Sequence, residues 1–360
     1  MINKIVMICI AVSAVIAGVD RILGNRLGLG GKFDNGFKQM GPVIFGMTGI
    51  LCLSPLLVKP LRFFTPFFSR FGMDPAVLAG INAIDMGGYQ LAAELAADPI
   101  AGKFAGLIIS ATFGCTFIFT IPVGFAMMRK EGRAPFIYGI LCGLITIPVT
   151  FLIGGPGLGL TFGQTLLNSL PVLLLSLLII IGILRNTPLL IWIFTFLARV
   201  VEAAAVIGIL AGLITYLTGW DLIPGIMPLE EALRAAALCA ILLIGSLPFA
   251  EIINRVLRKP LSKIGSKAQM ESKGITGLLL GIAAVTPALA EMSEMKDRDI
   301  TINAAFLVSA AAMLGPHLGV CQANDPEAVP AFLTAKIIGG ILAAITAGWL
   351  TRNNPRHKSS

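Results

Sequence analysis

Charged side chains are scarce in this sequence. Asp, Glu, Lys and Arg make up 13% of its 360 residues, against about 25% in soluble globular domains. Hydrophobic residues make up 56%, and the mean hydropathy is +0.89. Long apolar runs recur along nearly the whole chain, which predicts an all-α, polytopic integral membrane protein.

Other signatures are missing as well. Residues 170–184 show none of the alternation that a transmembrane β-barrel requires. The six cysteines have no CxxC spacing, so neither disulfides nor zinc is indicated. The sequence has no GxSxG elbow, HExxH motif or P-loop, and no cluster of His and Cys. We therefore expect no catalytic residues, no metal site, no cofactor and no enzyme activity.

The net charge is +8, and the basic residues lie mainly in short loops and the C-terminal tail, as the positive-inside rule predicts. No basic stripe interleaved with aromatic residues suggests a nucleic-acid surface. We therefore expect the chain to have a lipid bilayer as its partner and no nucleic acid.

The apolar pattern predicts about eleven transmembrane segments, within a range of ten to twelve, in one domain that covers residues 1–360. The predicted segments are 1–18, 40–58, 75–97, 104–128, 135–153, 165–184, 188–217, 232–257, 274–290, 302–320 and 331–350. Residues 61–72 hold five phenylalanines with Arg62 and Arg70, which favours an interfacial amphipathic segment over a span. Eleven crossings would place the basic tail outside, so one late segment is re-entrant or the count differs by one.

The segment 75–97 contains the most informative stretch. A carboxylate at a bilayer centre costs about 2.5–3.5 kcal/mol, and each glycine costs about 1 kcal/mol against alanine inside a helix. Irregular backbone at membrane depth is tolerated where it lines a cavity. We therefore predict an interrupted helix with a binding site, which draws on six residues: Asn82, Asp85, Gly87, Gly88, Tyr89 and Gln90. The alternative is a glycine packing contact, with the aspartate paired to a nearby cation.

Two halves of the chain show weak similarity to each other. Residues 57–61, 91–95 and 107–111 are followed by similar sequences at 257–261, 288–292 and 306–310. The order and nearly constant offset predict two internal repeats, at about 40–128 and 232–320. Whether they are parallel or inverted stays open.

The predicted repeat places a second helix interruption at or just before residues 285–287 (Val-Thr-Pro). Transporters built from repeats bind substrate between two such interrupted helices. Thr286, and Asn303 and Ser309 on the next segment, are therefore candidate ligands in the same pocket. His317 follows a Gly315-Pro316 break, and its alternative role is a hydrogen-bonded structural histidine.

Four stretches carry a family resemblance: residues 18–23, 33–41, 85–89 and 305–319. In them the chain resembles the bacterial ethanolamine utilization permease family, with Asp-Met-Gly-Gly-Tyr at 85–89 as the most specific element. The resemblance implies a multi-pass carrier or facilitator of ethanolamine in the bacterial inner membrane. It assigns no site residue, so the roles above come from the residues themselves.

Two other functions stay open from the sequence. One is an ion-coupled symporter of another small metabolite, in which Asp85 binds a proton or sodium. The other is a membrane scaffold or sensor that docks cytosolic enzymes, which the short loops disfavour. A homo-oligomer is compatible with either.

Overall fold

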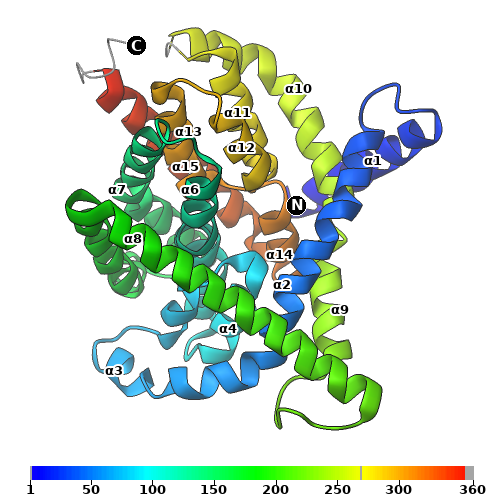
Figure 1. Cartoon of the computed structure of the whole chain (residues 1–360), viewed down its shortest axis with the longest axis vertical. Helices are drawn as coiled ribbons and strands as arrows, with labels where there is room; N and C mark the ends of the chain where they lie inside the picture. Colours follow the sequence, from blue (N-terminus) through cyan, green and yellow to red (C-terminus); the bar gives the residue numbers. More distant parts are fainter. Residues whose placement is uncertain (1, 268–269, 353–360) are drawn as a thin grey trace.

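The computed structural model describes residues 2–267 and 270–352, which form helices without a strand in these ranges (Figure 1). The first half contains α1 (Ile2–Ile22), α2 (Gly30–Arg62), α3 (Thr65–Arg70), η1 (Pro75–Ile81), η2 (Ile84–Met86), α4 (Gly88–Leu95), α5 (Pro99–Lys103), η3 (Phe104–Gly114), η4 (Thr116–Thr120), α6 (Ile121–Met127) and α7 (Arg133–Leu158). The second half contains α8 (Phe162–Thr218), α9 (Leu229–Ala240), α10 (Leu243–Lys267), α11 (Ser272–Ala283), α12 (Val285–Met292), α13 (Asp297–Ala310), α14 (Pro316–Asn324), η5 (Pro326–Ala328) and α15 (Val329–Arg352). The all-helical prediction is confirmed.

Seven helical stretches in the described part are long and apolar enough to cross a membrane. They are Gly30–Arg62, Pro99–Phe125, Arg133–Leu158, Phe162–Gly182, Arg199–Thr218, Leu229–Val256 and Pro326–Thr351. Each coincides with one of the eleven predicted segments. The remaining four predicted segments correspond to α1 and to three interrupted segments of shorter helices: η1, η2 and α4; α11 and α12; and α13 and α14.

The stretch Pro99–Phe125 lies at the centre of the bundle. In its most apolar part 94% of the residues are buried, against 22% in Arg199–Thr218. Figure 1 shows α8, which contains the latter stretch, crossing the front of the molecule. The central stretch therefore packs against protein on all sides, whereas this part of α8 presents most of its surface to the surroundings.

The central stretch differs from an ordinary α-helix, because η3 and η4 have π-helical hydrogen bonding. The Thr112 hydroxyl donates a hydrogen bond to the Ile108 carbonyl, at 2.6 Å. Hydroxyls that bond to the preceding turn compete with the backbone ladder and bend helices. π-Turns inside helices occur often at functional sites.

Close helix crossings depend on glycine. A Cβ atom at Gly49 of α2 would collide with the Ala205 backbone of α8, and one at Gly208 would collide with the Gly49 carbonyl. Small residues let backbones approach closely, which is how helices associate inside membranes. This crossing packs the peripheral α8 closely against α2.

The 57-residue α8 contains one non-helical residue, Asn186, with φ −151° and ψ 76°. The Asn186 Oδ1 accepts the Leu189 N–H at 3.2 Å, in the manner of an N-cap. The predicted spans 165–184 and 188–217 are therefore two helices joined by a kink.

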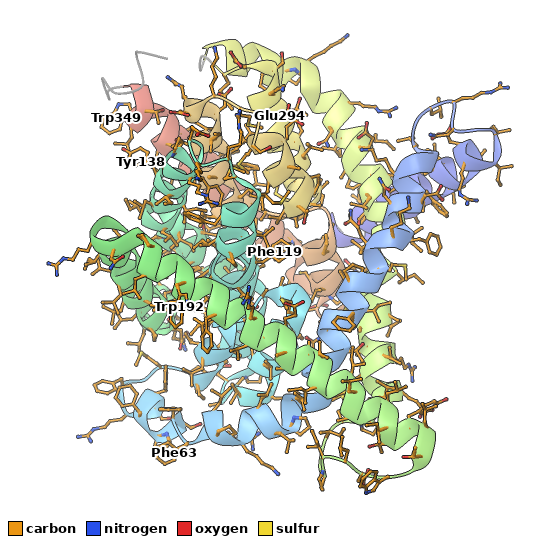
Figure 2. The ribbon with its side chains drawn as sticks, in the orientation of Figure 1. Phe63, Phe119, Tyr138, Trp192, Glu294 and Trp349 are labelled. Atoms are coloured by element: carbon orange, nitrogen blue, oxygen red, sulfur yellow. The ribbon has the colours of Figure 1, made fainter. Side chains whose placement is uncertain are left out.

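Exposed aromatic side chains lie at both ends of the bundle. Phe63, 82% exposed, lies beside α3 at one end, and the exposed Trp349 and the half-buried Tyr138 lie at the other (Figure 2). In α3 Phe67 is exposed and Phe68 is buried, which is the pattern of the predicted amphipathic segment. Aromatic residues favour the two membrane–water interfaces.

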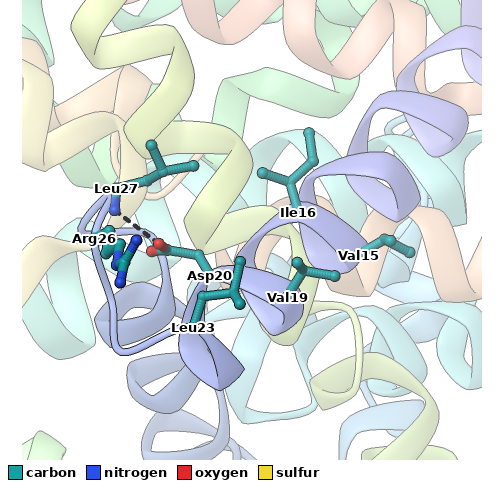
Figure 3. A pocket seen from close by; sticks show the side chains of 7 residues that line it. All are labelled: Val15, Ile16, Val19, Asp20, Leu23, Arg26 and Leu27. Atoms are coloured by element: carbon teal, nitrogen blue, oxygen red, sulfur yellow. Dashed lines mark hydrogen bonds between the residues drawn. The ribbon is translucent and has the colours of Figure 1, made fainter.

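Asp20 organises the turn between α1 and α2. Its buried carboxylate accepts backbone N–H groups from Leu27 at 2.7 Å, and from Leu29 and Gly30 at 2.9 Å each (Figure 3). It thus satisfies the N–H of Gly30, the first residue of α2, which has no partner within its own helix, and the N–H of the preceding residue, Leu29. Asp20 also borders a cavity of about 400 Å³ lined mainly by apolar side chains of α1.

The α2–α8 crossing gives a stability prediction. We expect Gly49→Ala to destabilise the protein by about 1–3 kcal/mol, the usual cost of overpacking, and to lower its melting temperature in detergent. Gly41→Ala on the same helix is the matched control, because nothing lies within 4 Å of a Cβ there. Equal melting temperatures for the two variants would contradict the close crossing.

Candidate binding site at the interrupted helices

The first interruption lies where the sequence predicts it. Asn82 and Ala83 have extended backbones between η1 and η2, with ψ 147° and 143°. Gly87 then takes a left-handed conformation with φ 83°, and α4 starts at Gly88. The left-handed region is open to glycine at little cost, so the first glycine of the pair permits this change of direction.

The interrupted backbone rests against η3. The Ser110 hydroxyl donates a hydrogen bond to the Asn82 carbonyl, which has no helical partner. A Cβ atom at Gly88 would collide with the Ser110 hydroxyl, and one at Gly114 with the Asn82 carbonyl. The glycines of both segments therefore allow the break and η3 to lie in direct contact.

Two amide side chains flank this break. Asn82 donates its Nδ2 hydrogen to the Met86 carbonyl at 2.8 Å, and Gln90 donates its Nε2 hydrogen to Asn324 Oδ1 of α14 at 3.3 Å. Asn82 Oδ1 and Gln90 Oε1 are both buried, and neither has a hydrogen-bond partner in the described part of the chain. Buried polar atoms are normally paired, so these two oxygens are acceptors available to a ligand.

Asp85 and Tyr89 complete the predicted first-half set. The Asp85 backbone lies in η2, and its side chain lies outside the described part of the structure. Tyr89 is half-buried and interacts electrostatically with Asp325 and Lys103. Those two residues form an ion pair at 2.8 Å, which joins α5 to the end of α14 and which sequence reasoning missed.

The second half contains two interruptions that face each other. The first lies at Ala284, with φ −160° and ψ 147°, just before α12. The second lies between α13 and α14, where Ala312 has φ 50°. The Ala312 N–H donates to the Gly281 carbonyl at 2.8 Å, and the Leu314 N–H donates to the Ile282 carbonyl at 3.0 Å. Each broken helix therefore satisfies backbone groups of the other.

Both second-half breaks are at the predicted places. Pro287 lies in the first turn of α12, and Pro316 is the first residue of α14. Proline is tolerated in a first turn because the N–H there needs no intrahelical acceptor. The break therefore precedes each proline, as expected for residues 285–287.

The predicted second-half residues lie in different surroundings. Thr286 is exposed on α12. Asn303 donates to the carbonyls of Gly274 and Asp299, both at 2.9 Å, and the Ser309 hydroxyl lies 2.9 Å from that of Thr150. These hydrogen bonds join α13 to the start of α11 and to α7.

His317 lies beside a lysine that sequence reasoning missed. Lys336 of α15 is completely buried, and its Nζ lies 3.3 Å from His317 Nδ1. The same ammonium donates a hydrogen bond to the Ala111 carbonyl at 2.7 Å. A lone lysine in the apolar segment 331–350 is itself a signal, by the same cost argument that singled out Asp85.

The element η3 connects the first break with His317. Ser110 contacts the Asn82 backbone, and the next residue, Ala111, contacts Lys336. Consecutive Cα atoms are only about 3.8 Å apart. The structure thus brings Asn82 and Gly88 against Ser110 of η3 and links His317 to the next residue, Ala111, through Lys336, while Asn303 and Ser309 hydrogen-bond to other elements.

Known proteins match this sequence along nearly its whole length. A family model described as "Ethanolamine utilisation protein, EutH" matches residues 2–350. The chain is 38% identical over 352 residues to YxeR of Bacillus subtilis, with 97% of this chain and 95% of that protein covered. It is 36% identical over 344 residues to a probable ethanolamine permease EutH of Listeria monocytogenes, covering 95% and 92% of the two chains. The corresponding Escherichia coli protein is 31% identical over 382 residues, with 95% and 94% covered. No solved structure matches the chain.

Proposed function

The chain belongs to the EutH family of ethanolamine utilisation proteins, and on this premise we propose that it carries ethanolamine across a membrane. It is a transporter and not an enzyme, and its relatives named as probable permeases are aligned over nearly their full length. We further propose that the substrate is the protonated amine and that it binds at the first helix interruption.

The observation that supports this site is the pair of unpartnered buried oxygens, Asn82 Oδ1 and Gln90 Oε1. The amine of ethanolamine resembles that of lysine, with a pKa of about 10.4, so the substrate is a cation at neutral pH. Its ammonium has three hydrogen-bond donors, like that of lysine, and its hydroxyl adds a fourth. Two acceptor oxygens on either side of an interrupted backbone suit such a donor-rich ligand.

The remaining first-half residues supply charge and an aromatic face. In our proposal Asp85 provides the carboxylate that compensates the ammonium, and the Tyr89 ring provides a cation–π surface. The Gly87 carbonyl already accepts the Leu91 N–H at 3.1 Å and Gly88 is the first residue of α4, so in our proposal these carbonyls serve the ammonium only through their second lone pairs. The site thus combines a charge, a ring and several oxygens within nine residues of the chain.

From the second half, we assign His317 to the side of the site that faces η3, and Thr286 to its rim. The hydrogen bonds of Asn303 and Ser309 to neighbouring helices give these two residues a supporting role, in which they hold α13 in position. The roles of His317, Asn303 and Ser309 follow from the contacts that their side chains make, and the role of Thr286 follows from its exposed position on α12.

The chain is a multi-pass membrane protein, and we propose that it crosses the bacterial inner membrane with about eleven segments in one domain. The seven long apolar stretches supply seven of them, and in our proposal α1 and the three interrupted segments supply four. We also propose that the interrupted segments belong to two repeats, at about 40–128 and 232–320. Each of these repeats contains a broken helix next to a polar cluster.

Removal of the Gln90 acceptor tests the site directly. A hydrogen bond to a charged group contributes about 1.5–3 kcal/mol, so we expect Gln90→Leu to raise the KM for ethanolamine about tenfold to hundredfold. Uptake of labelled ethanolamine into proteoliposomes measures this change. Gln164→Leu removes an exposed amide, whose Oε1 accepts from Thr161 in the cap of α8, and is expected to leave KM unchanged. A wild-type KM for Gln90→Leu would exclude this oxygen as a ligand.

We expect Asp85→Asn to abolish ethanolamine uptake while the protein still inserts and folds, because the substitution removes a charge and keeps the shape. The measurement is uptake per molecule of purified protein, with a melting curve to confirm folding. Asp221→Asn, at an exposed position between α8 and α9, is the matched control. Uptake at the wild-type rate by a folded Asp85→Asn variant would contradict the role of this carboxylate.

The dependence on pH follows from the charge of the substrate. The neutral amine, whose share rises with pH, crosses lipid unaided, whereas the cation meets the cost of desolvation. We therefore expect the share of uptake that needs this protein to be largest at acidic to neutral pH. Cells with and without the gene, compared at low ethanolamine over a pH series, provide the measurement. Equally poor uptake by the deletion strain at alkaline and acidic pH would refute this expectation.

A further inference from the structure

The interrupted segment 75–97 begins and ends at the same carboxylate. Asp74 is buried and directly precedes η1. Its Oδ2 accepts the N–H of Ala97 at 3.0 Å and that of Asp98 at 2.7 Å, both of which follow α4. The arms η1 and α4 have 7 and 8 residues, which makes each about 10–14 Å long. Each arm therefore reaches only about half way through a hydrocarbon core about 30 Å thick.

The two ends of the segment 272–292, which contains α11 and α12, also lie together. The Asp299 carboxylate, in the first turn of α13, accepts the N–H of Glu271 just before α11, at 3.0 Å. Two ion pairs connect the same ends of the segment. Lys273 pairs with Glu294 at 2.6 Å, and Lys296 pairs with Glu271, also at 2.6 Å. The chain therefore leaves this segment where it entered it.

The helix α7 separates these two meeting points. Before α7, Gly132 lies against Ile300 of α13, next to the ends of the segment 272–292. After α7, Gly159 lies against Ile100 of α5, next to the ends of the segment 75–97. With 26 residues, α7 is about 39 Å long, enough to cross the hydrocarbon core. The two segments therefore start from opposite ends of a membrane-spanning helix.

Two close helix crossings relate the halves of the chain. A Cβ atom at Gly245 of α10 would collide with the Ile10 carbonyl of α1. This crossing resembles that of Gly49 on α2 with Ala205 on α8, and the corresponding residues are separated by close to the offset of the two predicted repeats. α2 and α10 pack against each other and point to opposite ends of the molecule, where α3 follows α2 and where α10 ends (Figure 1). Equivalent crossings on helices of opposite direction indicate inverted repeats.

We propose that the segments 75–97 and 272–292 are re-entrant hairpins, which enter the membrane from opposite sides and act as the two gates of the transporter. The role as gates rests on the proposed function, whereas the hairpins themselves do not. Two of the about eleven segments proposed above then enter the membrane without crossing it, and the two repeats are inverted. Non-helical backbone at membrane depth is tolerated in such hairpins because protein surrounds it.

The charges assign a side to each hairpin. Residues 129–133 and 257–273, at the ends of the second hairpin, contain more basic residues than residues 59–74, which lead into the first. By the positive-inside rule the second hairpin therefore enters from the cytoplasm. The end of α15 lies on the same side, since Arg298 donates a hydrogen bond to the Gly348 carbonyl at 3.2 Å.

The helix α14 joins the two hairpins. Gly315, just before α14, lies against the Ala283 carbonyl at the turn of the second hairpin. Asn324, the last residue of α14, binds Gln90 of the first hairpin at 3.3 Å. In this arrangement the first hairpin separates the proposed site at Asn82 and Gln90 from the outer side, and the second hairpin separates it from the cytoplasm. Opening of one hairpin at a time gives alternating access to the site.

Single cysteines at both ends of each hairpin test the topology. We expect Ser69→Cys and Ala97→Cys, at exposed positions beside the first hairpin, to react with a membrane-impermeant maleimide in intact cells. We expect Ser272→Cys and Glu294→Cys, at exposed positions of the second hairpin, to react only after the cells are permeabilised. Exposed thiols react readily, so labelling should exceed that of the wild-type protein about tenfold. The wild-type protein is a suitable background because Cys9 is half-buried and the other five cysteines are buried.

A cysteine at the turn of the first hairpin tests the gates. Met86 is partly buried in η2, and we expect Met86→Cys to react with a permanently charged trimethylammonium thiol reagent in right-side-out and in inside-out vesicles. Ethanolamine at about ten times its Kd fills about nine sites in ten, so it should slow both reactions about tenfold. Ser69→Cys is the matched control, because we expect it to react only in right-side-out vesicles and at a rate that ethanolamine leaves unchanged.

Each outcome decides a separate point. If the two cysteines of either hairpin are labelled from opposite sides, that segment crosses the membrane and the proposal is overturned. Reaction of Met86→Cys from one side only would overturn the two gates. Wild-type protein that fails to take up ethanolamine into proteoliposomes would overturn the proposed function, and the labelling of the hairpin ends would still decide the topology. If Met86→Cys fails to fold, the four end positions keep the hairpins open to refutation.

Discussion

The requirement that every buried backbone group finds a partner controls this structure. A helix meets this requirement within itself, and a broken helix inside a membrane must obtain partners from its neighbours. The first break obtains one from the Ser110 hydroxyl. The two second-half breaks obtain theirs from each other, through the Ala312 and Leu314 N–H groups. Irregular backbone is therefore confined to places where another element lies in direct contact.

Small residues make those contacts available. Gly88 and Gly114 leave room for η3 against the first break, and Gly315 leaves room for the Ala283 carbonyl at the second-half breaks. The same device joins α2 to α8 at Gly49. Because the lipid offers no hydrophobic force between helices, close backbone packing contributes much of their association. The interrupted helices thus lie where backbones of neighbouring elements approach closely.

Polar groups gather where this packing leaves the helix ladder incomplete. The unpartnered oxygens of Asn82 and Gln90, and the ammonium of Lys336, all lie around η3, α4 and α14. The sequence analysis identified Asn82, Gln90 and His317 from the cost of polar residues and helix breakers in apolar segments. It missed Lys336, Lys103 and Asn324, because partners more than 200 residues apart are set by packing. Asn82 and Lys336 both hydrogen-bond to the central η3, through Ser110 and Ala111.

The sequence by itself determined the helical class, the apolar stretches, the family and the positions of the breaks at residues 82–88, 284 and 311–315. These features are local, since hydropathy sets a span and Gly or Pro sets a break within a few residues. Only the tertiary structure decided that η3 has π-helical geometry, that α8 bends at Asn186 and that Lys336 reaches Ala111. Those outcomes depend on which surfaces of distant helices pack together. Because the spans have similar apolar side chains, no single segment specifies its packing partner.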